Sequence, residues 1–304
     1  MFALRILEQH VGCERSQVLA VWLRVKMMFI TRASVLLLLA FPAVISEVVT
    51  FSKCSEFFFT GKPPEIPGMI KNVRYKTICQ KYDGRYRFAT LYDTTNRIPV
   101  FSAYKVTVDK EIDRPENKWM NEPQLEHPSD EMGMPYENQA TDEDFFDNNL
   151  NVNRGHLFPS CHSGDEVIAG STFTYTNIVP QKISFNSGSW NRMERETIKV
   201  MSEHCRDKKD NKVLAHVLTG AVPGNNKLNE RVNIPSFMWM TFCCYNFNNN
   251  KKSLFSKAYW APNKDEKDDT VTINEITLQE LQNNLNKKIK VKYLFDKNCS
   301  NRNV

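Results

Sequence analysis

The chain is predicted to adopt an α+β fold, and two features of its 304 residues lead to that prediction. Segments with strand composition and segments with helix composition both occur, but they do not alternate in the regular βαβ order of a doubly wound sheet. A hydrophobic content of 41% with 25% charged residues is ordinary for a globular protein and argues against disorder. No internal repeat or Gly/Ser-rich linker follows residue 46, so residues 47–304 are interpreted as one domain.

The first recognisable element is a β-hairpin. Residues 85–91 (RYRFATL) and 98–104 (IPVFSAY) are rich in strand-forming side chains and flank a polar turn at 93–96. Residues 172–179 (TFTYTNIV) are β-branched and aromatic, which predicts a further strand. After Pro180, residues 187–203 have the composition and length of a helix, which is expected to start near Asn186 and Gly188.

Two apolar segments in the second half of the chain predict buried strands, at 213–221 (VLAHVLTGA) and 236–245 (SFMWMTFCCY). The second is far too short to cross a bilayer, which takes about 20 apolar residues. Residues 278–285 predict a C-terminal helix.

Residues 109–147 form an acidic stretch with thirteen acidic side chains and three basic ones. Several prolines and little periodicity predict a long surface excursion rather than a regular element. The rest of the chain after residue 46 carries a basic surplus that would attract phosphates, although scattered solvated lysines explain it equally well. If this excursion packs near a substrate-binding cleft, its negative charge would repel phosphates. Its deletion is then expected to strengthen nucleic-acid binding.

The N-terminal residues 1–46 have the features of a secretory signal peptide. A basic region precedes an uncharged run at 33–46 that contains four consecutive leucines and ends in a small residue. Translation is expected to start at Met27 or Met28. An uncleaved signal anchor is the alternative, but the run is short for a membrane span. The mature chain is therefore predicted to be secreted and to have no transmembrane span.

Cysteine usage agrees with an oxidising compartment. Removal of the leader leaves seven cysteines, which are expected to pair as disulfides with one odd thiol: Cys54, Cys79, Cys161, Cys205, Cys243, Cys244 and Cys299. Their connectivity is open at this point. Their spacings match no zinc pattern, so disulfide bonding is the favoured role.

Residues 151–162 (NVNRGHLFPSCH) contain the first chemical motif. Arg154 offers a planar donor fork that suits phosphate, and Gly155 lets another group approach closely. His156 can take a proton near neutral pH. On its own this tripeptide is weak evidence, because a lone histidine is more often a hydrogen-bonded structural residue.

Residues 174–196 (TYTNIVPQKISFNSGSWNRMERE) contain the second motif. Asn177 is placed at the end of the predicted strand and Asn186 at the start of the predicted helix. Glu194 follows eight residues later, a little over two helical turns, and so lies roughly on the same face as Asn186. An amide oxygen suits Mg²⁺, which keeps several waters that a nearby carboxylate would hold.

These two blocks resemble the DNA/RNA non-specific endonuclease superfamily and, more specifically, the secreted endonuclease domain-containing 1 protein family. The resemblance extends to residues 79–104, residues 218–239 and the adjacent Cys243 and Cys244, and so covers most of residues 54–299. It implies a ββα-metal nuclease fold with a central, mostly antiparallel sheet flanked by helices.

The resemblance also implies a role for each motif residue. His156 is expected to be the general base that activates water. Asn186 is expected to be the direct protein ligand of a single Mg²⁺, with Mn²⁺ as the alternative ion, and Glu194 to orient the water around it. Arg154 is expected to stabilise negative charge in the transition state. Asn177 matches an active-site asparagine of the family, although a hydrogen bond at a strand end explains it equally well.

One position departs from the family pattern. The pattern most often reads Asp-Arg-Gly-His, whereas this chain has Asn153 at the first position. Losing that carboxylate is expected to weaken the support of the motif or to alter metal affinity.

The predicted function is that of a secreted, metal-dependent endonuclease. It would hydrolyse the phosphate backbone of DNA, RNA or both with little sequence specificity. The alternative is a catalytically silent protein that keeps the nuclease fold for binding or regulation, which the Asn153 departure and the acidic stretch favour. A zinc-dependent HNH-type nuclease is disfavoured, because the chain lacks the paired histidine and cysteine ligands for it.

Overall fold

The structure is a computed structural model that describes residues 47–108, 114–116, 118–126, 136–146, 148–248, 251–295 and 299. All of these residues belong to one compact unit, 44–304. The leader at 1–46 lies outside the described residues, so the signal peptide and its start site stay predictions.

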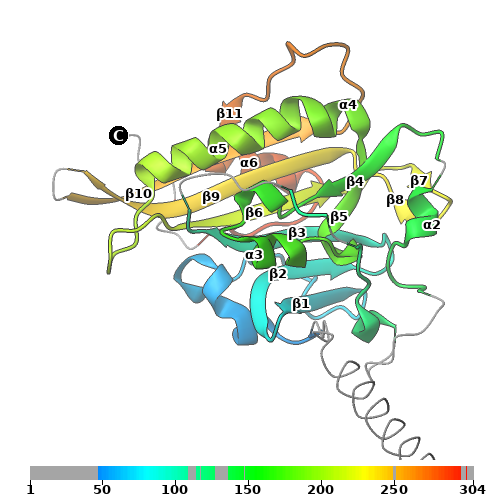
Figure 1. Ribbon diagram of the computed structural model, residues 1–304, viewed down its shortest axis with the longest axis horizontal. Coiled ribbons are helices and arrows are strands. Elements are labelled where there is room, and N and C mark those ends of the chain that lie inside the picture. Colours follow the sequence, from blue (N-terminus) through cyan, green and yellow to red (C-terminus); the bar gives the residue numbers. More distant parts are fainter. Residues whose placement is uncertain are drawn as a thin grey trace, which may run out of the picture. The chain divides into compact units, whose positions relative to one another are not determined.

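A seven-stranded antiparallel sheet forms the centre of the described chain (Figure 1), in the order β1-β2-β3-β6-β9-β10-β11. Its strands are β1 (Tyr75–Tyr82), β2 (Arg85–Asp93), β3 (Ile98–Val106), β6 (Ala215–Val222), β9 (Phe237–Asn248), β10 (Lys251–Pro262) and β11 (Glu275–Ile276). Two small ribbons join β4 (Val152–His156) to β5 (Ile178–Lys182) and β7 (Lys227–Leu228) to β8 (Val232–Asn233). This arrangement confirms the predicted α+β class.

Helices and short helical turns (labelled η) pack around the sheet. The helices are α2 (Asp142–Phe145), α3 (Glu166–Ser171), α4 (Ile183–Phe185), α5 (Asn191–His204) and α6 (Leu278–Asn286). The turns are η1 (Phe51–Phe57), η2 (Phe59–Gly61), η3 (Pro123–Leu125), η4 (Ser160–His162), η5 (Tyr175–Asn177) and the π-type turn η6 (Asn186–Trp190). Within the described residues, no helix is both long enough and apolar enough to cross a membrane.

The sheet is buried on both faces, which explains the nearly continuous apolar sequence of β6. Tyr104 of β3 pairs with Val217 of β6, and both pack in the core that also holds α5 and the β4–β5 ribbon. The next pair, Ala103 with Leu218, packs in the opposite core with η1 and α6. Successive side chains of a strand point to opposite faces, so one strand serves both cores.

Three disulfides join Cys54 to Cys79, Cys205 to Cys244 and Cys243 to Cys299. Cys161 is the remaining cysteine of the seven and stays outside these bridges. The prediction of paired cysteines with one odd thiol is therefore confirmed. The neighbouring Cys243 and Cys244 belong to opposite cores, so β9 is linked to the end of α5 on one face and to the C-terminal segment on the other.

Most predicted elements are present. The hairpin is β2 with β3, the two buried strands are β6 and β9, and the C-terminal helix is α6. The strand predicted at 172–179 is wrong in its first part, because Thr172 ends α3 and residues 175–177 form the turn η5. The Asn177 side chain donates to the Thr172 carbonyl oxygen (3.0 Å), which favours a turn over an extended ladder.

The acidic stretch is not a simple surface excursion in its described parts. Leu125, Gln139, Ala140 and Phe145 are buried, and Met120 forms a bridge to Thr174. The segment therefore contributes to the packed structure, and its deletion would remove core contacts as well as charge. Residues 109–113, 117, 127–135 and 147 lie outside the described residues.

Candidate active site

The β4–β5 ribbon carries the first motif. His156 pairs with Ile178, and Gly155 pairs with Val179. Directly after the ribbon, the Leu157 amide donates to the Asn177 carbonyl oxygen at 2.8 Å. This ladder fixes the backbone of His156 against the wall formed by β5 and η5.

His156 is buried, with 9% of its surface exposed. Its ring centroid lies 5.2 Å from that of Trp119 and 5.0 Å from that of Phe173. Its Nε2 atom has no hydrogen-bond partner within the described part of the chain. Burial, assisted by the positive charge of Arg114, lowers the pKa of His156 from 6.5 to about 3. The imidazole is therefore neutral at physiological pH and able to accept a proton.

Asn177 is fully buried, and both polar atoms of its side-chain amide are hydrogen-bonded to neighbouring groups. Its Oδ1 accepts from the Phe158 amide (3.0 Å) and the Ser102 hydroxyl (2.8 Å). Its Nδ2 donates to the carbonyl oxygens of Phe158 (3.1 Å) and Thr172 (3.0 Å). These bonds hold the residues directly after His156. The geometry agrees with structural hydrogen bonding by Asn177, the alternative to an active-site role.

Arg154 lies among aromatic rings. Its guanidinium carbon is 5.0 Å from the ring centroid of Phe145, 5.4 Å from that of Trp119 and 5.8 Å from that of Tyr175. One terminal nitrogen forms an ion pair with Asp142, which also accepts a 2.7 Å bond from the Tyr175 hydroxyl. Arg154 is therefore held in a fixed position by α2 and η5.

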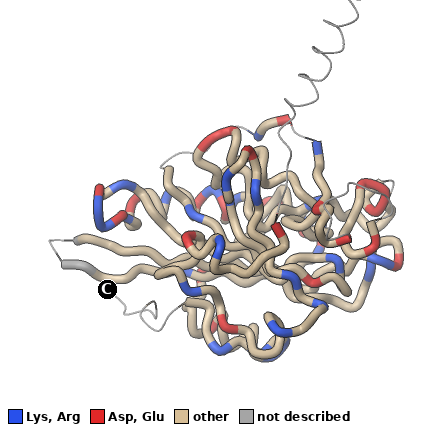
Figure 2. Tube along the Cα trace, turned by 90° about the horizontal axis from the view of Figure 1, so that it is seen from below, with Lys and Arg blue, Asp and Glu red and all other residues tan. Residues whose placement is uncertain are grey.

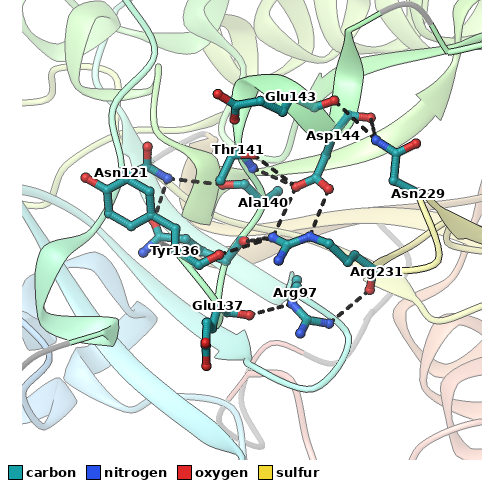
Figure 3. Close-up of polar contacts among 11 residues, drawn as sticks. Arg97, Asn121, Tyr136, Glu137, Ala140, Thr141, Glu143, Asp144, Asn229 and Arg231 are labelled. Carbon is teal, nitrogen blue, oxygen red and sulfur yellow. Dashed lines mark hydrogen bonds and ion pairs between the residues drawn. The ribbon is translucent and has the colours of Figure 1, made fainter. Parts of the chain in front are cut away.

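The helix α2 that supplies Asp142 is itself anchored (Figure 3). Arg231 donates through Nε to the buried Asp144 carboxylate at 3.0 Å and through Nη2 to the Gln139 carbonyl oxygen at 2.9 Å. Asn229 donates to the carbonyl oxygen of Asp144 at 3.2 Å. A segment that looked loose in sequence is thus fixed to the β7–β8 ribbon.

Asn186 begins the π-type turn η6 and contacts the position that departs from the family pattern. Its Nδ2 donates to Oδ1 of Asn153 at 2.8 Å. An amide oxygen accepts this bond as a carboxylate would, so Asn153 retains that contact. The bond leaves the Asn186 amide oxygen available as a hard ligand.

Gln181 lies on β5, against the strand β4 that carries the first motif. The sequence indicated no role for this residue. Its side chain is fully buried, yet neither Oε1 nor Nε2 has a partner within the described residues. A Cβ at Gly155 would collide with Gln181 Oε1, so the glycine of the motif makes room for this amide. Sequence gave no sign of this contact, because it depends on the register of β4 with β5.

Glu194 lies in the first turn of α5 and is 7% exposed. Burial raises its pKa from 4.5 to about 8, although neighbouring Trp190 and Arg195 act in the opposite direction. The buried His162 donates through Nε2 to the Glu194 carbonyl oxygen (3.0 Å), and its Nδ1 lies 3.1 Å from the Tyr104 hydroxyl. His162 therefore connects the first motif to the helix that carries Glu194, a role that sequence did not reveal.

Several of the polar groups near the two motifs are oxygen donors. Within the described residues no group of three or more His, Cys, Asp or Glu side chains gathers into a metal site. Single oxygen donors occur on separate elements, namely the amide oxygens of Asn186 and Gln181 and the carboxyl of Glu194, and no contact among the described residues joins the three. Oxygen donors of this kind fit Mg²⁺, which keeps part of its water shell.

Sequence reasoning brought together some residues that the structure also joins. Asn186 contacts the first motif through Asn153, and Asn177 contacts the residues that follow His156. Among the described residues no direct hydrogen bond joins His156 to Asn186 or Glu194, which lie on separate elements.

Comparisons with known proteins show what the chain is similar to. The chain is similar to the endonuclease domain-containing 1 proteins of Homo sapiens (31% identical over 216 residues) and Mus musculus (32% over 210 residues). These matches cover 65% and 64% of this chain but 40% and 39% of the relatives. The chain thus spans about two fifths of the length of the curated relatives it matches.

A solved structure described as the EndoG/EndoGI complex matches with a TM-score of 0.55 and 14% identity, over 84% of this chain and 95% of that chain. At that identity the likeness concerns the fold, and it confirms the predicted ββα-metal nuclease architecture. The profile of the DNA/RNA non-specific endonuclease family matches residues 67–300. With this match over most of its length, the chain belongs to the DNA/RNA non-specific endonuclease family.

Proposed function

We propose that the chain is a metal-dependent endonuclease that hydrolyses phosphodiester bonds of DNA, RNA or both with little sequence specificity. The observation that carries this proposal is the neutral, buried imidazole of His156, whose Nε2 has no partner within the described residues. A buried polar atom without a partner is costly, so it is kept where a ligand or a reacting group will meet it.

In the proposed reaction His156 removes a proton from the attacking water. Its low pKa keeps it unprotonated, and the negative charge of a bound phosphate would raise that pKa and strengthen the base. A positioned base contributes about 10² to 10⁴ in rate. Asn177 acts through the backbone that follows His156 and is a positioning residue.

The rest of the transition-state stabilisation is assigned to cations and to positioned hydrogen-bond donors. Mg²⁺, or Mn²⁺ as the alternative, would neutralise charge on the phosphate and on the leaving oxygen when bound at Asn186. Glu194 would orient water beside this site through hydrogen bonds. Arg154, already fixed among aromatic rings, would stabilise the charge that develops on the phosphate oxygens.

We also propose that the protein is secreted. The predicted signal peptide and the three disulfides support an oxidising compartment. A catalytically silent binding protein is the second candidate, and the ion pair of Arg154 with Asp142 favours it, because it occupies a cation that the reaction needs.

The test uses purified protein that begins at Glu47, with plasmid DNA and structured RNA as substrates. Cleavage is expected with Mg²⁺ and is expected to stop with EDTA. Asn186→Ala is expected to lose as much activity as His156→Ala. Folded protein that cleaves neither substrate with any divalent ion would favour the silent binding protein.

A further inference from the structure

A pocket of about 520 Å³ opens next to Trp119 and Phe173. It is lined by Arg114, Pro115, Glu116, Lys118, Trp119 and Phe173. Trp119 and Phe173 also contact the His156 ring, so the pocket shares a wall with the proposed base. Its size is in the range of pockets that hold small organic groups, about 300 to 1,000 Å³.

The aromatic wall of this pocket is fixed before any ligand arrives. The Trp119 ring lies 5.1 Å from Phe173 and 5.8 Å from Tyr175, measured between centroids. The next residue, Met120, donates its amide to Phe173 O and accepts from the Tyr175 amide, both at 2.9 Å. Because Trp119 is only partly buried, it offers a rigid and accessible ring.

Two cations lie at the rim of the same pocket. Arg114 and Lys118 are exposed, and the Arg114 guanidinium carbon is 5.1 Å from the Phe173 ring centroid. Glu116 is the acidic residue of the lining. Elsewhere in the described part of the chain, basic and acidic residues are interspersed in the view of Figure 2.

We propose that this pocket is a substrate subsite that stacks an unpaired nucleobase on Trp119 while Arg114 and Lys118 bind an adjoining phosphate. The proposal rests on the proposed nuclease function and names the form of its substrate. Stacking on an aromatic side chain tolerates any base, because every base has a π-face. A base can enter such a pocket only when it is out of the duplex stack. The chain therefore prefers single-stranded DNA or RNA to duplex.

The test measures binding without cleavage. A labelled 12-nucleotide single strand and the matching duplex are titrated in EDTA by fluorescence anisotropy, with the protein that begins at Glu47. The wild-type chain is expected to bind the single strand about tenfold more tightly than the duplex, the order expected for one stacked base. Trp119→Leu is expected to lose this preference, and Trp119→Tyr to keep most of it.

The cations are tested separately. Arg114→Gln with Lys118→Gln is expected to weaken binding and to reduce the slope of log K against log salt by about 0.7 for a single strand, because the two cations together neutralise one phosphate. Lys209→Gln, which changes an exposed lysine on the turn after α5, is the matched control and is expected to change neither quantity.

Equal affinity for single strand and duplex, or a preference that survives in folded Trp119→Leu, would overturn the subsite. A cleaving enzyme without the preference would refute the subsite and leave the proposed function standing. A protein that shows the Trp119-dependent preference for single strands but never cleaves would support the subsite and refute the proposed function.

Discussion

Burial sets the protonation state of the proposed base. His156 is neutral because desolvation and the nearby Arg114 lower its pKa to about 3. The acid side of the kcat/KM profile reports groups of the free enzyme. We therefore expect this profile to stay flat well below pH 6.5, the ordinary pKa of histidine, before activity falls. Arg114→Gln removes a repelling charge and is expected to move the fall to higher pH. A fall centred at pH 6.5 in the wild-type enzyme would contradict this account.

The ion pair between Asp142 and Arg154 competes with phosphate for the same guanidinium. Asp142 is largely exposed, so the pair is worth about 1 kcal/mol at most, which corresponds to roughly fivefold in affinity. Asp142→Asn is expected to lower KM by up to that factor and to change kcat less. Glu143→Gln is the charge-matched control on the same helix, because no contact joins its side chain to Arg154 in the described structure. A higher KM for Asp142→Asn would mean that the carboxylate serves to position Arg154.

At the level of elements, the sequence predicted segments whose apolar pattern is local and strong. β6 and β9 are such segments, and the β2–β3 hairpin was visible from its polar turn. β1 and β10 were not predicted, since lysine, serine and other polar residues interrupt their apolar positions. The start of β5 was misplaced because the side chain of Asn177, rather than β propensity, decides the backbone there.

The turn that carries Asn186 shows what sequence alone does not reveal. Ser189 donates its amide to Glu266 Oε2 at 3.0 Å, and the two residues are 77 positions apart. A Cβ at Gly188 would collide with the same carboxylate oxygen. Nothing local in the sequence indicates that a loop after β10 supports the turn η6.

This support leads to a prediction about metal affinity. Gly188→Ala must shift either Glu266 or the turn, so the Mg²⁺ concentration for half-maximal cleavage is expected to rise, on the order of tenfold. Ser187→Ala is the control in the same turn, because its hydroxyl bonds only the Ile183 carbonyl oxygen (2.8 Å) among the described residues. An unchanged Mg²⁺ midpoint in Gly188→Ala would show that Asn186 does not depend on this contact.

For the whole molecule, four buried groups among the described residues contribute to how the stability of the metal-free protein depends on pH. His156 has a pKa lowered from 6.5 to about 3, and His162 and His216 have pKa values lowered from 6.5 to about 4. The unfolded chain therefore binds more protons at these residues, and stability is lost as the pH falls below 6.5. The pKa of Glu194 is raised from 4.5 to about 8, so the folded chain holds an extra proton and stability is lost as the pH rises toward 8.

The balance of these groups places maximum stability near pH 6.5. Each proton changes the free energy of unfolding by about 1.4 kcal/mol per pH unit. Urea unfolding in EDTA, measured at a series of pH values, checks the shape of this curve. Glu194→Gln is expected to remove the loss between pH 6.5 and 8. Wild-type stability that keeps rising to pH 8 would contradict the neutral state of Glu194.

The net charge of the acidic stretch was a poor guide to its role in the structure. Its charge predicted a repelling surface, but its described parts bury side chains, fix Arg154 through Asp142 and add Trp119 to the wall of His156. Of the motif residues, Asn186 contacts the first motif through Asn153 and Asn177 contacts the residue two positions after His156. Their partners Gln181, His162 and Asp142 depend on tertiary packing and were not visible from sequence.

The central claim is that His156 is the general base. Its most direct test is rescue of the His156→Ala variant by added imidazole. His156→Ala is expected to remain folded and to lose about 10² to 10⁴ in cleavage rate with Mg²⁺. Added imidazole is expected to restore part of that rate in proportion to its neutral form, while leaving the Asn186→Ala variant unchanged. Full activity of His156→Ala without imidazole would contradict the assignment of His156 as the general base.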